Sequence, residues 1–269
     1  QNFQRHAPMS KDPWLLGIFV NNEIHWQHKA SFSKQILSLK NTIPVRSAFE
    51  KFLKKKYRSI ESLNLKWQSD FKSFKKISEN NIQHSNVFKK DMQAFFAYYV
   101  DAYYRLVRSE LKKVFPNHLY LGSRLHGKSK YSSILHEKAA QYCDVVSFNI
   151  YDYSVRNFKL LAKIDKPIII GEFHFGTASH GVWGSGLRNA ASLENQANLY
   201  KQYISEASTH PNIVGAHWFQ WSDQPVTGRF DGENFRIGIV NITDQPYVPL
   251  INAIEEVSKG LYLNRIEKN

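Results

Sequence analysis

Residues 166–176 read KPIIIGEFHFG, and they form the clearest strand pattern in the chain. The three consecutive isoleucines are typical of a strand that is covered on both faces of a sheet. The run ends at Gly171 and Glu172, so a carboxylate follows directly on a segment suited to the protein interior. Because a buried carboxylate is costly unless it is paired or used, Glu172 is a candidate functional residue.

Other apolar runs of similar length alternate with amphipathic segments along the 269 residues. The further expected strands are 14–20, 118–125, 144–151 and 212–219. The expected helices are 46–67, 89–114, 155–163, 192–208 and 248–259, with Ser192 as the N-cap of the fourth. This alternation predicts an α/β fold with a parallel sheet, and both an open doubly wound sheet and part of an eight-stranded barrel fit it.

Polar and aromatic side chains gather where the expected strands end. The candidates are Asn22, Glu23, Arg124, Asn149, Tyr151, Glu172, His174, His217, Trp218, Gln220, Trp221 and Asp223. The C-terminal ends of parallel strands carry the active site in (β/α)8 barrels, so this distribution favours a TIM barrel.

The sequence patterns that mark several other kinds of functional site are absent. The histidines form neither an HxH nor an HExxH pattern, so no metal site is expected. No GxSxG elbow, Walker loop or strand-linked GxGxxG occurs, and no cofactor is expected. Cys143 is the only cysteine, which excludes an internal disulfide.

The chain carries a formal net charge of +13, with lysines concentrated in residues 51–76. No compact Lys/Arg motif for reading bases is present, so we expect no nucleic acid partner. The lysines form either a solvated helix face or a surface that attracts a sulfated or otherwise acidic glycan. No segment has the length of a membrane span, and the oligomeric state stays open.

Two carboxylates among many aromatic residues indicate glycoside hydrolysis. One carboxyl group protonates the leaving oxygen, and the other attacks the anomeric carbon or directs water to it. If Glu23 and Glu172 face the same barrel mouth, a retaining mechanism follows. Asn22 is suited to hold the sugar 2-hydroxyl, a tyrosine beside the nucleophile can orient it, and a tryptophan offers a flat platform for the sugar.

Several segments carry a family resemblance. GIFVNNE (17–23) resembles the acid/base strand of the clan of retaining (β/α)8 glycosidases, and KYRSIESLNLKW (56–67) resembles the β-galactosidase-like members of that clan. The segments that resemble glycoside hydrolase family 50, the β-agarases, are GEFHFG (171–176), GLRNAASLENQA (186–197), GAHWFQWSDQPVTGRFDGENFRIGIV (215–240) and DQPY (244–247). The resemblance covers nearly the whole chain and is strongest over 166–247.

The resemblance implies roles for individual residues. Glu23 corresponds to the acid/base, Glu172 to the nucleophile and Asn22 to the residue that contacts the 2-hydroxyl. The residues in pocket positions are Tyr151, His174, Trp218, Gln220, Asp223 and Arg229. The implied reaction is hydrolysis of the β-1,4 bond from galactose to 3,6-anhydrogalactose in agar, often with release of disaccharides from a chain end. A β-galactoside, a sulfated galactan such as porphyran, or glycan binding without catalysis are the alternatives.

In this clan the acid/base strand is the fourth of eight. Residues 1–269 are therefore expected to be the C-terminal portion of one barrel domain, holding strands four to eight and the C-terminal helix. The first strands and any accessory domain are expected to be absent. Because agar is too large to enter a cell, we expect a secreted or periplasmic bacterial protein.

Overall fold

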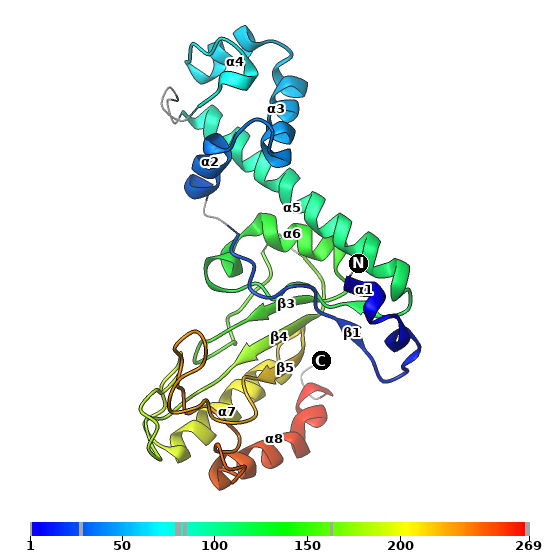
Figure 1. The fold of residues 1–269 in the computed structure, drawn as a ribbon. Helices are drawn as coiled ribbons and strands as arrows, with labels where there is room; N and C mark the ends of the chain where they lie inside the picture. The colour runs from blue at the N-terminus through cyan, green and yellow to red at the C-terminus, as the bar shows by residue number, and fades with distance from the viewer. Residues whose placement is uncertain (1, 27–28, 79–81, 83–84, 162–163, 267–269) are drawn as a thin grey trace. The chain divides into compact units, whose positions relative to one another are not determined.

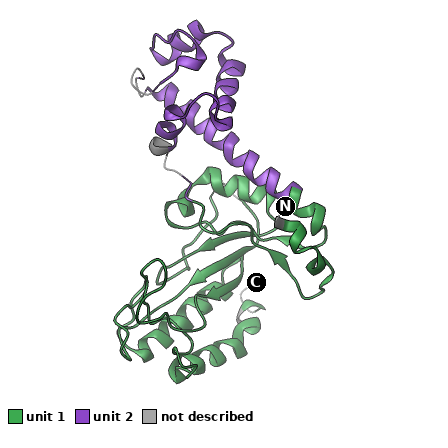
Figure 2. Ribbon diagram, viewed as in Figure 1, with its two compact units in different colours: residues 1–24, 110–269 green, residues 25–109 purple. Residues whose placement is uncertain are grey.

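The computed structural model describes residues 2–26, 29–78, 82, 85–161 and 164–266. The chain forms two compact units, one of residues 1–24 with 110–269 and the other of residues 25–109 (Figure 2). None of the described helices combines the length and the apolar character needed to cross a membrane.

The first unit contains short parallel strands that follow each other in chain order (Figure 1). The strands are β1 (Gly17–Ile18), β2 (Leu119–Tyr120), β3 (Val146–Asn149), β4 (Ile168–Phe173) and β5 (Ile213–Trp218). β1 pairs with β2, and β3, β4 and β5 form a second ladder. A parallel bridge between Leu125 and Phe148 joins the segment after β2 to β3. The predicted α/β class with parallel strands is therefore confirmed.

β4 is the central strand of its ladder, and all six of its residues are buried. Ile168 is paired with Val146 on one side and Ile213 on the other. Behind the ladder, Phe173 stacks on Tyr203 of α7 with ring centroids 4.3 Å apart. Because successive strand residues point to opposite faces and all six are buried, both faces of β4 are covered, as expected for a parallel strand.

Helices complete the first unit. They are α1 (Asn2–Arg5), α6 (Ser133–Tyr142), α7 (Leu193–Ser208) and α8 (Val248–Ile266), with 3₁₀ turns η1 (Ala7–Lys11) and η4 (Gly127–Tyr131). The side-chain oxygen of Ser192 accepts the Asn195 N–H at the start of α7, which confirms the predicted N-cap. The final helix reaches Ile266, beyond the predicted end at residue 259.

The second unit is helical. Its elements are α2 (Lys29–Ser38), α3 (Pro44–Tyr57), α4 (Ile60–Trp67), the 3₁₀ turn η2 (Phe74–Lys76) and most of α5 (Asn86–Val114). Asp91 is fully buried in this unit and accepts hydrogen bonds from Trp67 Nε1 at 2.8 Å, Tyr57 Oη at 2.5 Å and Lys56 Nζ. These donors compensate the burial of its carboxylate.

One expected helix does not form, and another helical segment is interrupted. The helix expected at 155–163 does not form over the described residues 155–161, where Glu206 accepts the N–H groups of Val155 and Arg156. Residues 46–67 are mostly helical, as expected, but they form two helices with a break at Arg58, where φ is +64°.

Candidate active site

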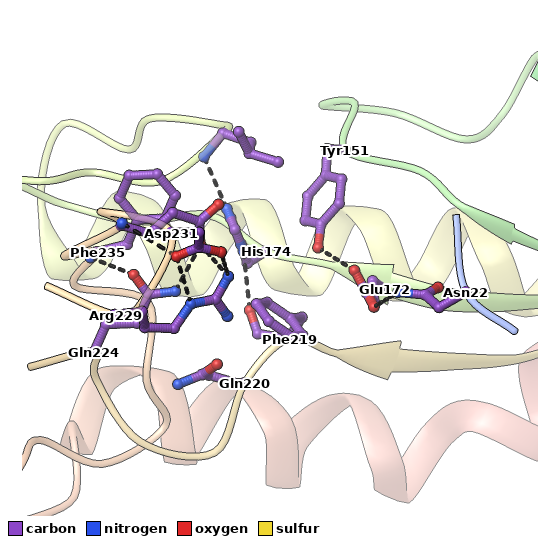
Figure 3. Close-up of polar contacts among 12 residues, drawn as sticks. Asn22, Tyr151, Glu172, His174, Phe219, Gln220, Gln224, Arg229, Asp231 and Phe235 are labelled. Carbon is purple, nitrogen blue, oxygen red and sulfur yellow. Dashed lines mark hydrogen bonds and ion pairs between the residues drawn. The ribbon is translucent and has the colours of Figure 1, made fainter. Parts of the chain in front are cut away.

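Glu172 lies near the end of β4, and its carboxylate is held by three side chains from other segments. Tyr151 Oη donates to Glu172 Oε2 at 2.7 Å, and Arg124 Nη1 lies 3.1 Å from Glu172 Oε1. Asn22 Nδ2 is 3.5 Å from the same Oε1. Figure 3 shows Tyr151 and Asn22 pointing toward the carboxylate. Only 8% of Glu172 is exposed, so it depends on these groups rather than on water.

The protonation of Glu172 reflects opposing effects. Burial raises the pKa of its carboxyl group, while the Tyr151 hydrogen bond and the Arg124 charge lower it and the nearby Glu23 charge raises it again. Burial and the negative charge of Glu172 also raise the pKa of Tyr151. The phenol therefore stays protonated and donates a hydrogen bond to the carboxylate.

Asn149, the last residue of β3, links Glu23 to Asn22, the residue whose amide contacts Glu172. Its Nδ2 donates to Glu23 Oε1 at 2.8 Å and lies 3.3 Å from Asn22 Oδ1. In the parallel ladder, Asn149 is the register partner of Glu172. One amide therefore fixes Glu23 and Asn22 beside the strand that carries Glu172.

Gly171 is needed for this arrangement. A Cβ atom at this position would lie 2.2 Å from Arg124 Cδ and 2.8 Å from Asn149 Oδ1. Both contacts are far shorter than van der Waals separation, so a side chain here would displace the partners of both Glu172 and Glu23. The Gly-Glu pair in the sequence thus has a direct steric reason.

His174 is buried, and backbone groups engage both of its ring nitrogens. Nδ1 donates to the Phe219 carbonyl oxygen at 2.9 Å, while Nε2 accepts the Leu187 N–H at 2.8 Å. Burial lowers the pKa of His174 to about 4, so the ring is neutral in this role. These contacts hold two loops together, and they differ from the substrate contact expected from the sequence.

The predicted residues at the end of β5 are also engaged by protein groups. Trp218 Nε1 donates to the Ile237 carbonyl oxygen at 2.8 Å. Asp223 accepts the Gly238 N–H at 2.7 Å and the Tyr247 hydroxyl at 2.5 Å. Asp223 and Trp218 therefore brace the loop after β5.

The remaining predicted residues have more open surroundings. Gln220 Nε2 donates to the Ser222 carbonyl oxygen at 3.0 Å, and Trp221 is 65% exposed. His217 is exposed, and its ring forms a T-shaped pair with the ring of Phe19. The Arg124 guanidinium lies over the same Phe19 ring. Trp221 and His217 are thus accessible to a ligand.

Arg229 belongs to an ionic cluster in the loop after β5. Its guanidinium pairs with Asp231 at 2.6 Å and Glu233 at 2.8 Å and lies over the Phe219 ring (Figure 3). Gln224 Nε2 also donates to Glu233 at 2.9 Å. Asp231, Glu233 and Gln224 were not singled out in the sequence, because ion pairs within an irregular loop have no regular spacing that would predict them.

The site is therefore a pair of carboxylates joined through amides, with a tyrosine and an arginine on one of them. This is the set of groups required for acid and nucleophilic catalysis at an acetal carbon. Among the described residues, no three His, Cys, Asp or Glu side chains are arranged to hold a metal ion together.

Comparison with known proteins places these residues in a family context. The glycoside hydrolase family 42 model, described as beta-galactosidase, matches residues 8–171. Beta-agarase B of Vibrio sp. (strain JT0107) is 39% identical over 271 residues, covering 96% of this chain and 28% of that protein. Beta-agarase A of the same strain is 35% identical over 273 residues, covering 93% of this chain and 27% of that protein.

A solved structure described as "Structural analysis of an exo-beta-agarase" superposes with a TM-score of 0.90 at 34% identity. The alignment covers 98% of this chain and 38% of that chain. The chain thus spans well under half of the length of the proteins that it matches. The suspected relationship to the β-agarases and to the β-galactosidase clan is confirmed.

Proposed function

The chain belongs to the glycoside hydrolase family described as beta-galactosidase, and from this premise we propose that it hydrolyses β-1,4-galactosidic bonds of agar or agaro-oligosaccharides. The observation that carries the proposal is the linked pair of carboxylates, in which Asn149 bonds to Glu23 and lies beside Glu172 in the ladder. Its relatives at 35% and 39% identity, both named as beta-agarases, support the choice of galactan.

The proposed mechanism is retaining, and it proceeds in two displacements. A Glu172 oxygen attacks the anomeric carbon while the glycosidic bond breaks, and Glu23 gives its proton to the departing oxygen. Glu23 then takes a proton from water, whose oxygen attacks the anomeric carbon and releases Glu172. Tyr151 and Arg124 stabilise the Glu172 carboxylate before attack and after release, and Asn22 holds the sugar 2-hydroxyl.

Further features of the proposal rest on the relatives and on the nature of the substrate. We infer exo action with disaccharide release, which the similarity to a structure described as an exo-beta-agarase supports. The five strands correspond in this proposal to strands four to eight of a (β/α)8 barrel, consistent with their parallel pairing. A polymeric substrate implies a secreted or periplasmic location.

Incubation with neoagaro-oligosaccharides, followed by chromatography and mass spectrometry of the products, tests the proposed function. We expect disaccharide release by the unaltered chain and none by the Glu172→Gln variant. A thermal melt of both proteins reports folding. A cooperatively folded chain that releases no disaccharide, or a variant that releases as much as the parent, contradicts the proposal.

A small β-galactoside is the second candidate substrate, because the matching family model is described as beta-galactosidase. Parallel assays with an aryl β-galactoside and with neoagarotetraose separate the two. A kcat/KM at least about tenfold higher for the aryl galactoside, despite its few sugar contacts, would favour this second candidate.

Substituting Asn149 by alanine is expected to lower kcat by about 10- to 100-fold, because misplacement of reacting groups by about an ångström costs this much. The variant loses the amide that donates to Glu23 and contacts Asn22. Steady-state kinetics on an agaro-oligosaccharide measure the loss. Asn212→Ala, whose amide pairs with exposed Asp165, serves as the control and should keep the parent rate. An Asn149→Ala variant with unchanged kcat would refute the positioning role.

The Tyr151→Phe variant is expected to move the acidic limb of the kcat/KM profile to higher pH. The Tyr151 hydrogen bond lowers the pKa of Glu172, so its removal raises that pKa, and ionised Glu172 then requires a higher pH. A pH–rate profile measures the limb. Tyr153→Phe, which removes a hydroxyl bonded to the Asn189 carbonyl oxygen, is the matched control. If the acidic limb of the Tyr151→Phe profile stays in place or moves to lower pH, the proposed effect of Tyr151 on Glu172 is contradicted.

A further inference from the structure

A groove with a volume of about 860 Å³ runs along α3 in the unit of residues 25–109. Its lining includes Ser47, Lys51, Phe52, Lys55 and Lys56 of α3 and Tyr98 of α5. We call it the α3 groove. Residues 47, 51, 52, 55 and 56 recur at intervals of three and four, so they share one face of the helix. None of these residues belongs to the unit that carries Glu23 and Glu172.

Three lysines make the α3 groove basic, and one of them is already paired with an acidic residue. Lys56 is paired with the buried Asp91, and its side chain is 46% exposed. Lys51 and Lys55 are exposed, and neither has an ion pair or hydrogen bond within the described ranges. The neighbouring acid Glu50 is buried and faces Arg46. Two unneutralised cations therefore stand one helical turn apart along the groove.

Aromatic rings complete the wall of the α3 groove. The rings of Phe52 and Tyr98 lie 6.3 Å apart at 38°. Tyr98 is 49% exposed, although it also stacks on Phe95. A partly exposed ring offers an apolar face together with a hydroxyl group, which matches the mixed character of a sugar ring. Cations beside such rings suit a sugar chain that carries anionic groups.

We propose that the α3 groove binds a galactan chain bearing sulfate esters, as a site additional to the catalytic carboxylates. Lys51 and Lys55 pair with successive sulfate groups, and Tyr98 and Phe52 contact the sugar rings between them. The identity of the ligand rests on the proposed function, because the chemistry of the groove specifies an anionic chain with apolar faces and the relatives specify a galactan.

Binding of porphyran oligosaccharides to the full chain, measured by calorimetry at low and at physiological ionic strength, tests the proposal. The Lys51→Gln/Lys55→Gln double variant is expected to bind about fivefold or more weakly at low ionic strength, with a smaller salt dependence. Tyr98→Ala is expected to weaken binding while keeping the parent's salt dependence, since it removes a ring and no charge. Both variants should hydrolyse short neutral agaro-oligosaccharides at the parent rate.

The matched control is Lys66→Gln/Lys72→Gln, which removes two exposed lysines of the same unit that do not line the groove. It should bind porphyran within about twofold of the parent. An equal loss of porphyran affinity in Lys51→Gln/Lys55→Gln and in the control would show that net charge alone attracts the ligand, which would overturn the proposal. Unchanged binding in Lys51→Gln/Lys55→Gln, or equal competition by a DNA oligonucleotide, would overturn it as well. All binding measurements are made in a Glu172→Gln background, which prevents turnover, so failure of the proposed hydrolysis is distinguished from failure of this site.

Discussion

Replacing Glu172 by glutamine is expected to lower kcat by about 10⁴-fold or more, the scale of loss seen when a covalent nucleophile is removed. Glutamine keeps the shape of the side chain, and its oxygen can still accept the Tyr151 hydrogen bond. It loses the negative charge that pairs with Arg124 and that makes a carboxylate oxygen nucleophilic toward the anomeric carbon. The loss should therefore fall on kcat, with substrate binding retained.

Steady-state kinetics on neoagarotetraose, with a thermal melt of each protein, measure this effect. Glu256→Gln provides the control, because it makes the same chemical change at a carboxylate of the same unit that pairs with Lys201 at the surface. Its kcat should equal that of the parent. Turnover by Glu172→Gln within about tenfold of the parent would exclude Glu172 as the nucleophile.

Replacing Glu23 by alanine is expected to lower kcat by about 10²- to 10⁴-fold on an oligosaccharide, the range for loss of a general acid. The effect should depend on the leaving group. An aryl galactoside with an acidic phenol needs little protonation, so its first displacement should be nearly unaffected. Azide should restore part of the rate and give a β-galactosyl azide, because it attacks the glycosyl-enzyme without needing a base.

A series of aryl galactosides with phenols of different acidity provides the measurement. The parent should show a shallow dependence of kcat/KM on phenol acidity, and Glu23→Ala a steep one. The same slope in both proteins, together with no azide product, would mean that Glu23 does not supply the proton. A thermal melt of both proteins checks that the substitution leaves the fold intact.

The elements that the sequence predicts well are those fixed by local signals. The apolar run of β4 and the Ser192 cap of α7 depend on neighbours within a few residues, and both are found. The expected helix at 155–163 does not form over the described residues 155–161. This segment instead makes a contact that is distant in sequence, in which Glu206 accepts the backbone N–H groups of Val155 and Arg156.

The candidate site likewise combines features that the sequence predicts with features that it does not. Strand ends are visible in the sequence, and the structure places Glu23, Asn149 and Glu172 in one connected set of side chains. The sequence does not show which partner each polar side chain binds. His174 was expected to contact the substrate, yet its ring nitrogens bind backbone groups of Leu187 and Phe219. The catalytic roles of Glu23 and Glu172 stay predictions until kinetics test them.

Trapping the glycosyl-enzyme tests the central claim most directly. The chain is incubated with a 2-deoxy-2-fluoro-β-galactosyl substrate bearing a good leaving group, digested with a protease and analysed by mass spectrometry. The fluorine destabilises the transition states of both displacements, and the good leaving group lets the first outpace the second, so the covalent intermediate accumulates. We predict one galactosyl adduct per chain, on the peptide that contains Glu172. An adduct on any other carboxylate, or no adduct together with a product of inverted anomeric configuration, would contradict the proposal.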